Sequence, residues 1–596
     1  MIDTPNSLSL LPALKREPAG GGPLPPSLRR VARSLRHYSK AVFWLGLGAF
    51  ILVPCICFLA LAISPRLFDQ GPQWLTLSYL SSSLSGGTFR ALADSLWVSG
   101  AATGFGLIVG FPLAWLVTRS DMPGRRYVRG AMWVTLLLPS WLPALGWVRL
   151  VEADGVMYRM GLHWSFFSHA ILGPFGVVLL LGLRNVPFSF LAVSAAFGGL
   201  GQEFEDAARV HGATRLQSVL LLGRMMSPAI WSALAIGFAE AVSDYGVAAT
   251  LAYTAHFPLA TYALYNAIGN FPPSFPAAAA VGWLLVALVS LPLFLQTRAL
   301  KGRSYAVLSG RTRQVKAAVL SRRAKVLAVG GTSLFFLVAL AVPGLGAISG
   351  SLLSDFGGSF SLTLVNYRAV FSQSSLFGPI ERSLLYGFVA AAVTVAAGVV
   401  VARFLTQRTT KTSRLLDLLL LAAVALPGVV FAAGYIFAYN LPFFSRLGVS
   451  LYQTTTLLVI AYIASSLPTN SRVLMGPVSQ LQPSLHDSAR AHGAGPIRAW
   501  ANGVLPVLSR PLVMAFILTF TGVFLELPIS QLLYAPNSPP VSVAIENNLG
   551  NYHFGIGVAQ AVVSVGCVLL AVAFVLVCYR LLAPRGWRQI GELSNG

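Results

Sequence analysis

The sequence predicts an all-α, polytopic membrane protein with about 12 transmembrane helices in two tandem repeats. Its composition, the spacing of its apolar runs and an internal repeat predict this fold class. Of the 596 residues, 55% are hydrophobic and 10% are charged, whereas a soluble domain carries about 25% charged residues. Since a helix that crosses a bilayer uses about 20 apolar residues, about 12 spans with their connections account for the chain.

Apolar runs of this length predict six spans in each half of the chain. The first six lie near residues 41–63, 93–117, 131–150, 170–196, 228–252 and 277–297, and the second six near 326–348, 383–405, 415–438, 453–476, 511–534 and 556–580. The predicted division is a basic N-terminal tail (1–40), a first six-helix domain (41–298), a basic linker (299–325), a second six-helix domain (326–583) and a C-terminal tail (584–596).

The net charge of +23 is better explained by membrane topology than by nucleic-acid binding. Most of the 42 lysines and arginines lie in the two tails, the linker and alternate loops. Basic residues gather in the cytoplasmic loops of membrane proteins. This distribution predicts that both termini are cytoplasmic and that the chain has no nucleic-acid partner. The four cysteines lie in apolar stretches without metal-binding spacing.

The two halves repeat one another. Pro139 and Gly146 match Pro427 and Gly434 at an offset of 288 residues, and the octapeptide at 206–213 matches 487–494 at an offset of 281. Because each half has an even number of predicted spans, both halves insert in the same direction. We expect a pseudo-twofold axis along the membrane normal.

The repeated octapeptides lie in loops predicted to be cytoplasmic. Glu205 and Asp206 place negative charge where the dipole of a starting helix favours it. Gly212 and Gly493 can end the helix in a left-handed conformation. The residues between are small: Ala207 and Ala208 in the first copy, and Ser488 and Ala489 after Asp487 in the second. Each half therefore presents a short, small-faced helix, and we expect these helices to dock into grooves on a partner.

These loops resemble the EAA motif of ABC importer permeases, which runs E-A-A-x-x-x-G and ends in Leu-Pro. Pro506 matches that final proline, whereas Arg224 and Met225 stand at the Leu-Pro places of the first copy. Asp206 and Asp487 replace the glutamate. The resemblance implies a fused, two-domain permease with the MetI-like, type I fold. It also implies an inner-membrane location, coupling helices that seat on an ATPase subunit, expected as a dimer, and a periplasmic substrate-binding protein.

No catalytic motif is recognisable in the chain. None of its lysines follows a glycine, so the phosphate-binding sequence G-x-x-x-x-G-K-[ST] is absent. We therefore expect that the chain is not an enzyme, binds no cofactor, and depends on ATP bound to a partner. A gradient-driven secondary transporter is the alternative class, because such carriers also have parallel halves.

Charged side chains inside the predicted spans are candidates for the translocation path, because burying them in a membrane is costly. They are Arg184, Glu240, Asp244 and Glu526, and Tyr245 adjoins one of them. An arginine–carboxylate pair that only packs the bundle is the alternative. No metal ligand can be assigned from spacing.

The segments around two of these acids resemble ferric-iron permeases. Residues 243–247 resemble the D-F-G/D-Y-G segment of that group, and residues 524–529 resemble its E-L-P segment. Three carboxylates against one arginine favour a cationic cargo. Ferric iron is the preferred prediction, and thiamine, a polyamine or a phosphonate are the alternatives.

Overall fold

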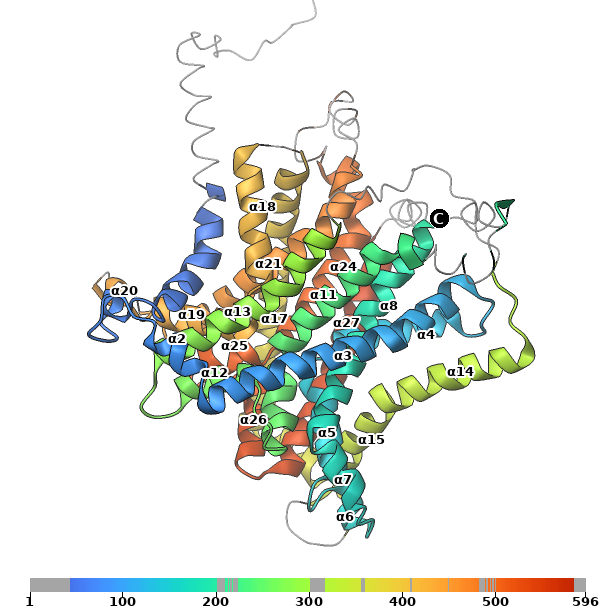
Figure 1. Cartoon of the computed structure of the whole chain (residues 1–596), viewed down its shortest axis with the longest axis horizontal. Coiled ribbons are helices and arrows are strands. Elements are labelled where there is room, and N and C mark those ends of the chain that lie inside the picture. Colours follow the sequence, from blue (N-terminus) through green and yellow to red (C-terminus); the bar gives the residue numbers. More distant parts are fainter. Residues whose placement is uncertain are drawn as a thin grey trace, which may run out of the picture.

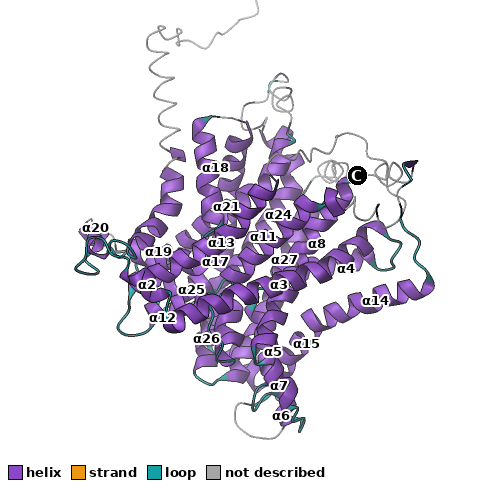
Figure 2. Ribbon diagram, viewed as in Figure 1, coloured by secondary structure: helices purple, strands orange, loops and turns teal. Residues whose placement is uncertain are grey.

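The computed structural model is helical, and its described part contains no β-strand apart from two isolated bridges (Figure 2). The structure describes a few isolated residues and these ranges: 46–200, 223–300, 317–354, 360–407, 410–446, 450–481 and 500–583. The predicted tails lie outside the described residues.

Eight described helices are long and apolar enough to cross a membrane, or up to ten if each of two bent pairs counts as one span. The eight are α3 (Gly86–Arg119), α8 (Pro174–Gly199), α13 (Phe275–Leu300), α14 (Arg322–Phe336) continued by α15 (Val342–Ser351), α17 (Ser374–Gln407), α21 (Thr455–Ser479), α24 (Leu505–Phe524) and α27 (Phe554–Leu582). The prediction of an all-α, polytopic membrane protein is confirmed.

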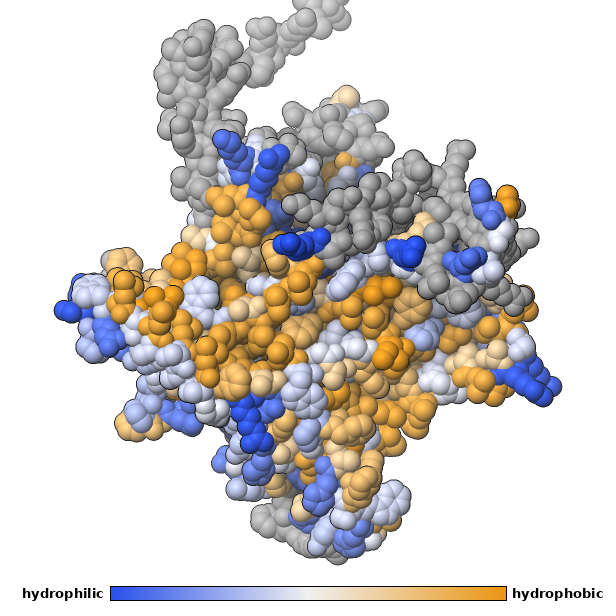
Figure 3. Space-filling model, in the orientation of Figure 1, coloured by the Kyte–Doolittle hydropathy of each residue, from blue (hydrophilic) through white to orange (hydrophobic). Residues whose placement is uncertain are grey.

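Apolar side chains form a band across the molecule, with hydrophilic side chains above and below it in the view shown (Figure 3). On α27, for example, Leu569, Leu570 and Phe574 are exposed. Exposed apolar area of this extent is unstable in water and matches the interior of a bilayer.

The predicted spans at 131–150 and 415–438 are both sharply bent in the structure. The first is divided into α4 (Arg125–Leu137) and the segment Trp141–Arg159, which begins with α5 (Trp141–Val151), at an angle of 89°. The second is divided into α18 (Lys411–Val424) and α19 (Gly428–Ala438), which meet at 107°. Pro139 and Pro427 stand at the breaks, where a proline removes a backbone donor and disfavours helical geometry before it.

Two further predicted spans are interrupted. α11 (Ser227–Ser243) stops before Asp244 and resumes as the π-helical turn η2 (Ala248–Ala252), and α24 resumes as α25 (Pro528–Leu533). Each of the predicted spans at 228–252 and 511–534 therefore contains a break that the sequence analysis did not describe. The short helices α12 (Ala260–Gly269) and α26 (Val541–Gly550) follow these breaks.

The remaining described helices are shorter. They are Gly46–Ala60 at the first predicted span, η1 (Pro65–Phe68), α2 (Ser78–Ser83), α6 (Val156–Arg159), α7 (Ser165–Ile171), α16 (Val365–Ser372), α20 (Pro442–Arg446) and the π-helical turns η3 (Leu337–Ala341) and η4 (Trp500–Val504).

The repeat in the sequence is also a repeat of contacts. The Ser95 hydroxyl accepts a 2.8 Å hydrogen bond from the backbone N–H of Ala260, at the start of α12. The Ser383 hydroxyl accepts a 2.8 Å bond from the N–H of Val541, at the start of α26. Ser383 lies 288 residues after Ser95, and Val541 lies 281 residues after Ala260, which are the two offsets of the sequence repeat. The helices α12 and α26 are therefore equivalent elements.

The first helix of each half packs against the other half, which the sequence did not suggest. α15 lies beside α5 (Figure 1), where the backbones of Pro343 and Gly146 touch so closely that a Cβ on Gly146 would collide with Pro343. In the equivalent contact, a Cβ on Gly434 of α19 would lie 2.8 Å from the Cα of Cys55. Both glycines are required by this close approach.

Candidate translocation cavity and coupling loops

A cavity of about 560 Å³ lies where the four interrupted spans meet. Its wall contains the residues at each break: Leu138 to Trp141, Ser243 to Gly246, Val424 to Leu426, and Leu525 to Pro528. Arg184 of α8 and Glu240 of α11 complete the charged part of the wall. Helix ends inside a membrane expose unpaired backbone groups, which are tolerated where they face a water-filled cavity or polar side chains.

Arg184 connects two of these breaks in the first half. Its guanidinium donates a 2.8 Å hydrogen bond to the carbonyl oxygen of Leu138, which ends α4, and its Nε lies 3.7 Å from Oδ2 of Asp244. The other carboxylate oxygen of Asp244 accepts a 2.7 Å bond from the N–H of Val247. The arginine is thus placed at the negative end of one helix, and the carboxylate at the start of the next turn.

Glu526 occupies the corresponding break in the second half, where no described arginine forms an ion pair with it. Its carboxylate accepts backbone hydrogen bonds from Ile529 at 2.7 Å and from Ser530 at 2.8 Å, so it caps the N-terminus of α25. The backbone oxygens of Asp244 and Glu526 accept bonds from equivalent hydroxyls, Thr261 on α12 and Ser542 on α26. The two breaks are therefore built in the same way.

The cavity wall carries more acidic than basic side chains. Asp244 compensates Arg184, whereas Glu240 and Glu526 have no ion-pair partner among the described residues. The structure therefore contains features of both alternatives, the arginine–carboxylate pair and the charged side chains that line a cavity. An arginine–carboxylate pair is present, but it lines the cavity together with further carboxylates. Tyr245 is buried in the same wall.

The halves also meet at the cavity through a contact that the sequence analysis missed. The indole N–H of Trp141, at the start of α5, donates a 3.1 Å hydrogen bond to the carbonyl oxygen of Leu525, at the end of α24. This bond satisfies an end carbonyl of α24 from the opposite half. Both residues are uncharged and lie in different halves, so spacing alone could not have identified the pair.

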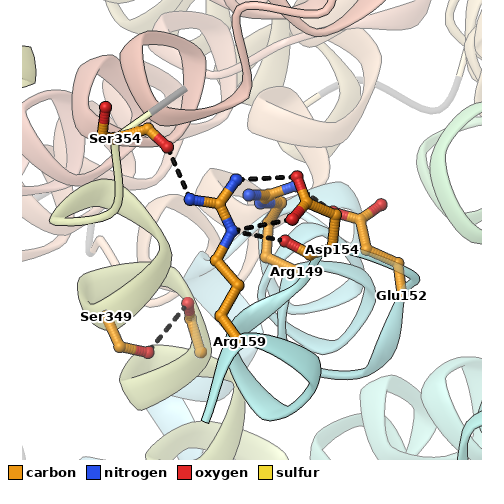
Figure 4. Close-up of polar contacts among 7 residues, drawn as sticks. Arg149, Glu152, Asp154, Arg159, Ser349 and Ser354 are labelled. Carbon is orange, nitrogen blue, oxygen red and sulfur yellow. Dashed lines mark hydrogen bonds and ion pairs between the residues drawn. The ribbon is translucent and has the colours of Figure 1, made fainter. Parts of the chain in front are cut away.

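Two clamps that join the halves stand at the end of the molecule marked by α6 and α7 (Figure 4). Arg159 forms a two-pronged pair with Asp154, at 3.0 and 2.7 Å, and donates a 2.6 Å bond to the carbonyl oxygen of Ser354. Arg149 pairs with Glu152, and its guanidinium lies 4.7 Å from the ring centroid of Phe554 on α27. The sequence analysis did not single out either arginine.

The two repeated loops are described in part. Gly212 and Gly493 have φ angles of +75° and +83°, so both adopt the expected left-handed conformation. Thr214 and Gln217 exchange side chain–backbone hydrogen bonds of 2.8 and 3.3 Å, which start the next helical turn. Pro506 is buried near the start of α24. Ser488 is helical, and these predicted coupling residues lie outside the described residues: Glu205, Asp206, Ala207, Ala208, Asp487 and Ala489.

Comparison with known proteins agrees with this architecture. Residues 394–588 match the family model described as binding-protein-dependent transport system inner membrane component. A putative ferric transport system permease protein of Haemophilus influenzae is 23% identical over 79% of this chain and 73% of its own length. A probable ABC transporter permease protein of Sinorhizobium fredii is 26% identical over 95% of this chain and 100% of its own. The chain resembles a fused ABC importer permease.

The predicted resemblance is therefore confirmed, and the matches add information about the repeat. A sulfate transport system permease protein of Salmonella typhimurium is 26% identical over 42% of this chain but 90% of its own length. Less than half of this chain thus corresponds to nearly all of that relative.

Proposed function

We propose that this chain is the membrane permease of a binding-protein-dependent ABC importer and that its cargo is ferric iron. The observation that carries the cargo assignment is the cavity wall, where Glu240 and Glu526 lack ion-pair partners among the described residues and the only arginine is compensated by Asp244. Hard cations prefer such oxygen ligands. The names of the relatives that match most of the chain, which include ferric transport permeases, support the same cargo.

The relatives for sulfate and molybdate favour a second cargo class, an oxyanion. Arg184 is the group that an anion would need. In this chain its guanidinium is already held by Asp244 and by the carbonyl oxygen of Leu138. An anion would therefore have to displace a carboxylate and then face Glu240, which favours the cation.

In the proposed mechanism, Gly212 and Gly493 mark the two turns that dock on a dimer of ATPase subunits. A periplasmic binding protein delivers the cargo from the opposite side. ATP binds to the partner, and this chain supplies no catalytic group and no cofactor site. Closing of the ATPase dimer would move the two halves about the pseudo-twofold axis and open the cavity alternately to each side. We place the chain in the bacterial inner membrane with both termini in the cytoplasm.

The test is reconstitution of the full chain in lipid vesicles with its ATPase and its binding protein. ATP hydrolysis is measured with the binding protein loaded in turn with Fe(III), thiamine, a polyamine, a phosphonate, sulfate and molybdate. We expect stimulation by the Fe(III) form alone. Stimulation only by an anion would overturn the cargo assignment, and transport driven by an ion gradient without ATP would overturn the transporter class.

A further inference from the structure

Oxygen-bearing side chains from both halves gather on the side of the cavity away from the Gly212 and Gly493 turns. α11 runs from the Gly212 loop to the break after Ser243, and Tyr245 lies in that break. Beyond it, α12 carries Tyr262 and Tyr265, and the equivalent helix α26 carries Glu546. A cargo that enters from this side would pass α12 and α26 before it reaches Tyr245 in the cavity wall.

The three tyrosines form one cluster. The ring centroid of Tyr245 lies 5.5 Å from that of Tyr265 and 6.5 Å from that of Tyr262, and the latter two are 5.9 Å apart. Glu526 and Glu546 both lie close enough to Tyr245 to act electrostatically on its phenol, and Glu546 also acts on Tyr262. Two carboxylates of the second half therefore approach Tyr245, and one of them also approaches Tyr262.

The internal repeat explains why these groups face each other. Tyr265 lies five residues after Ala260, and Glu546 lies five residues after Val541, where Ala260 and Val541 make the equivalent bonds to Ser95 and Ser383. The same position of the two repeats is thus a phenol in one half and a carboxylate in the other. Equivalent positions around a pseudo-twofold axis can bind one ligand between the halves.

Two polar groups at the cluster lack a partner among the described residues. Glu546 has no ion-pair partner among the described residues. Gln531 of α25 donates a 3.3 Å hydrogen bond to the Tyr265 hydroxyl, while its own carbonyl oxygen Oε1 is buried without a hydrogen-bond partner in the described part. A buried unpaired acceptor is costly, and a cation bound beside Tyr265 would supply a partner for the amide oxygen of Gln531.

We propose that Tyr245, Tyr262, Tyr265, Glu526 and Glu546 form an oxygen-donor site for Fe(III) at the edge of the cavity, where Tyr245 and Glu526 belong to the cavity wall. Phenolate and carboxylate oxygens are hard donors, and a tyrosine oxygen can ligate ferric iron. Each phenol that binds the metal releases its proton to water. Since both halves supply donors, a movement of the halves about their axis separates the donors and releases the ion. This inference rests on the proposed ferric cargo.

The test uses the full chain with its ATPase in lipid nanodiscs, titrated with Fe(III) supplied as its nitrilotriacetate complex. Phenolate bound to Fe(III) produces a charge-transfer band in the visible spectrum, which carboxylates alone do not give. We expect this band in the unchanged protein, and at least about tenfold weaker Fe(III) binding in the Tyr262→Phe/Tyr265→Phe double variant and in Glu546→Gln. The matched control is Tyr253→Phe, because Tyr253 touches the Tyr262 ring at 5.3 Å but is itself exposed.

The outcomes separate this site from the proposed cargo. Absence of the band, or a band that persists unchanged in the double variant, overturns the site even if Fe(III)-loaded binding protein still stimulates ATP hydrolysis. If the unchanged protein shows no such stimulation, the cargo assignment itself fails. Co-purification of each variant with the ATPase shows that its fold is intact, so a lost band is not the result of unfolding.

Discussion

The Arg159 guanidinium lies 2.6 Å from the carbonyl oxygen of Ser354 and so joins the first half of the chain to the second. Its side chain is only 3% exposed, and the same group holds both oxygens of Asp154 (Figure 4). The Asp154 side chain is 59% exposed, so only the arginine side of this clamp is buried. Charge-assisted hydrogen bonds of this kind are stronger than neutral ones.

Replacing Arg159 by Met should destabilise the contact between the halves. Loss of hydrogen bonds to a charged group costs about 2 kcal/mol, so we expect a lower apparent unfolding temperature of the detergent-solubilised chain, followed by tryptophan fluorescence. Arg90→Met is the matched control, because the Arg90 side chain is 73% exposed and lies 3.8 Å from Asp94. Surface pairs of that kind contribute about 0 to 1 kcal/mol. Equal effects of the two variants would contradict the clamp.

Gly146→Ala should loosen the packing of α5 on α15. The new Cβ would collide with the backbone of Pro343, and such overpacking costs about 1 to 3 kcal/mol. Gly130→Ala on α4 is the control, since a Cβ there meets nothing within 4 Å. The two variants are compared in the same unfolding experiment. The close approach is refuted if Gly146→Ala unfolds at the temperature of the control.

Gly212→Val and Gly493→Val should each uncouple ATP hydrolysis from transport in reconstituted vesicles. Both glycines have positive φ, where a β-branched residue is strained, so the turn would change shape. Gly212→Asn is the control, because asparagine tolerates this conformation. Cargo uptake per ATP hydrolysed is the measurement. Undiminished coupling in the double valine variant would exclude the proposed docking role of these turns.

Glu240→Gln should reduce Fe(III) uptake while leaving the fold intact. Glu240 lines the cavity and makes no ion pair with a described residue, so its charge has a role for a cation but none that we find in packing. We expect at least about a tenfold loss, equivalent to roughly 1.4 kcal/mol, measured as uptake of radioactive iron into vesicles. Glu381→Gln is the control, because Glu381 is exposed on α17 outside the cavity. If Glu240→Gln reduces Fe(III) uptake no more than Glu381→Gln does, the result contradicts a role of Glu240 in the cation path.

The sequence was sufficient to predict the helical class, the repeat and the left-handed glycines because each depends on local chemistry. Apolar runs reveal helices wherever they pass through the bilayer, and Gly212 and Gly493 recur within matching octapeptides. The breaks at Asp244 and Glu526 were not predictable from hydropathy, because apolar residues continue across them and a window of 20 residues averages over one interrupted turn. Long-range contacts such as Trp141 to Leu525 depend on how the halves cross, which one sequence does not specify.

Asp121 offers a test of how the linker is attached to the first half. Its carboxylate lies 2.6 Å from Nζ of Lys325 and accepts a 2.8 Å hydrogen bond from the N–H of Leu320. These contacts hold the pKa of Asp121 below its usual value, so they stabilise the docked linker at and above the ordinary pKa of an aspartate and are lost as the pH falls through the lowered one.

Asp121→Asn should therefore speed hydrogen exchange at Leu320 near neutral pH, where the carboxylate is otherwise ionised. In the unchanged chain, Leu320 should become as weakly protected as in the variant only at acidic pH. The exchange rates are first corrected for their intrinsic pH dependence. Mass spectrometry of the peptide that contains residues 317–325 is the measurement, and Asp69→Asn, on a distant exposed turn, is the control. If protection of Leu320 is the same in both variants, the carboxylate of Asp121 does not hold the linker.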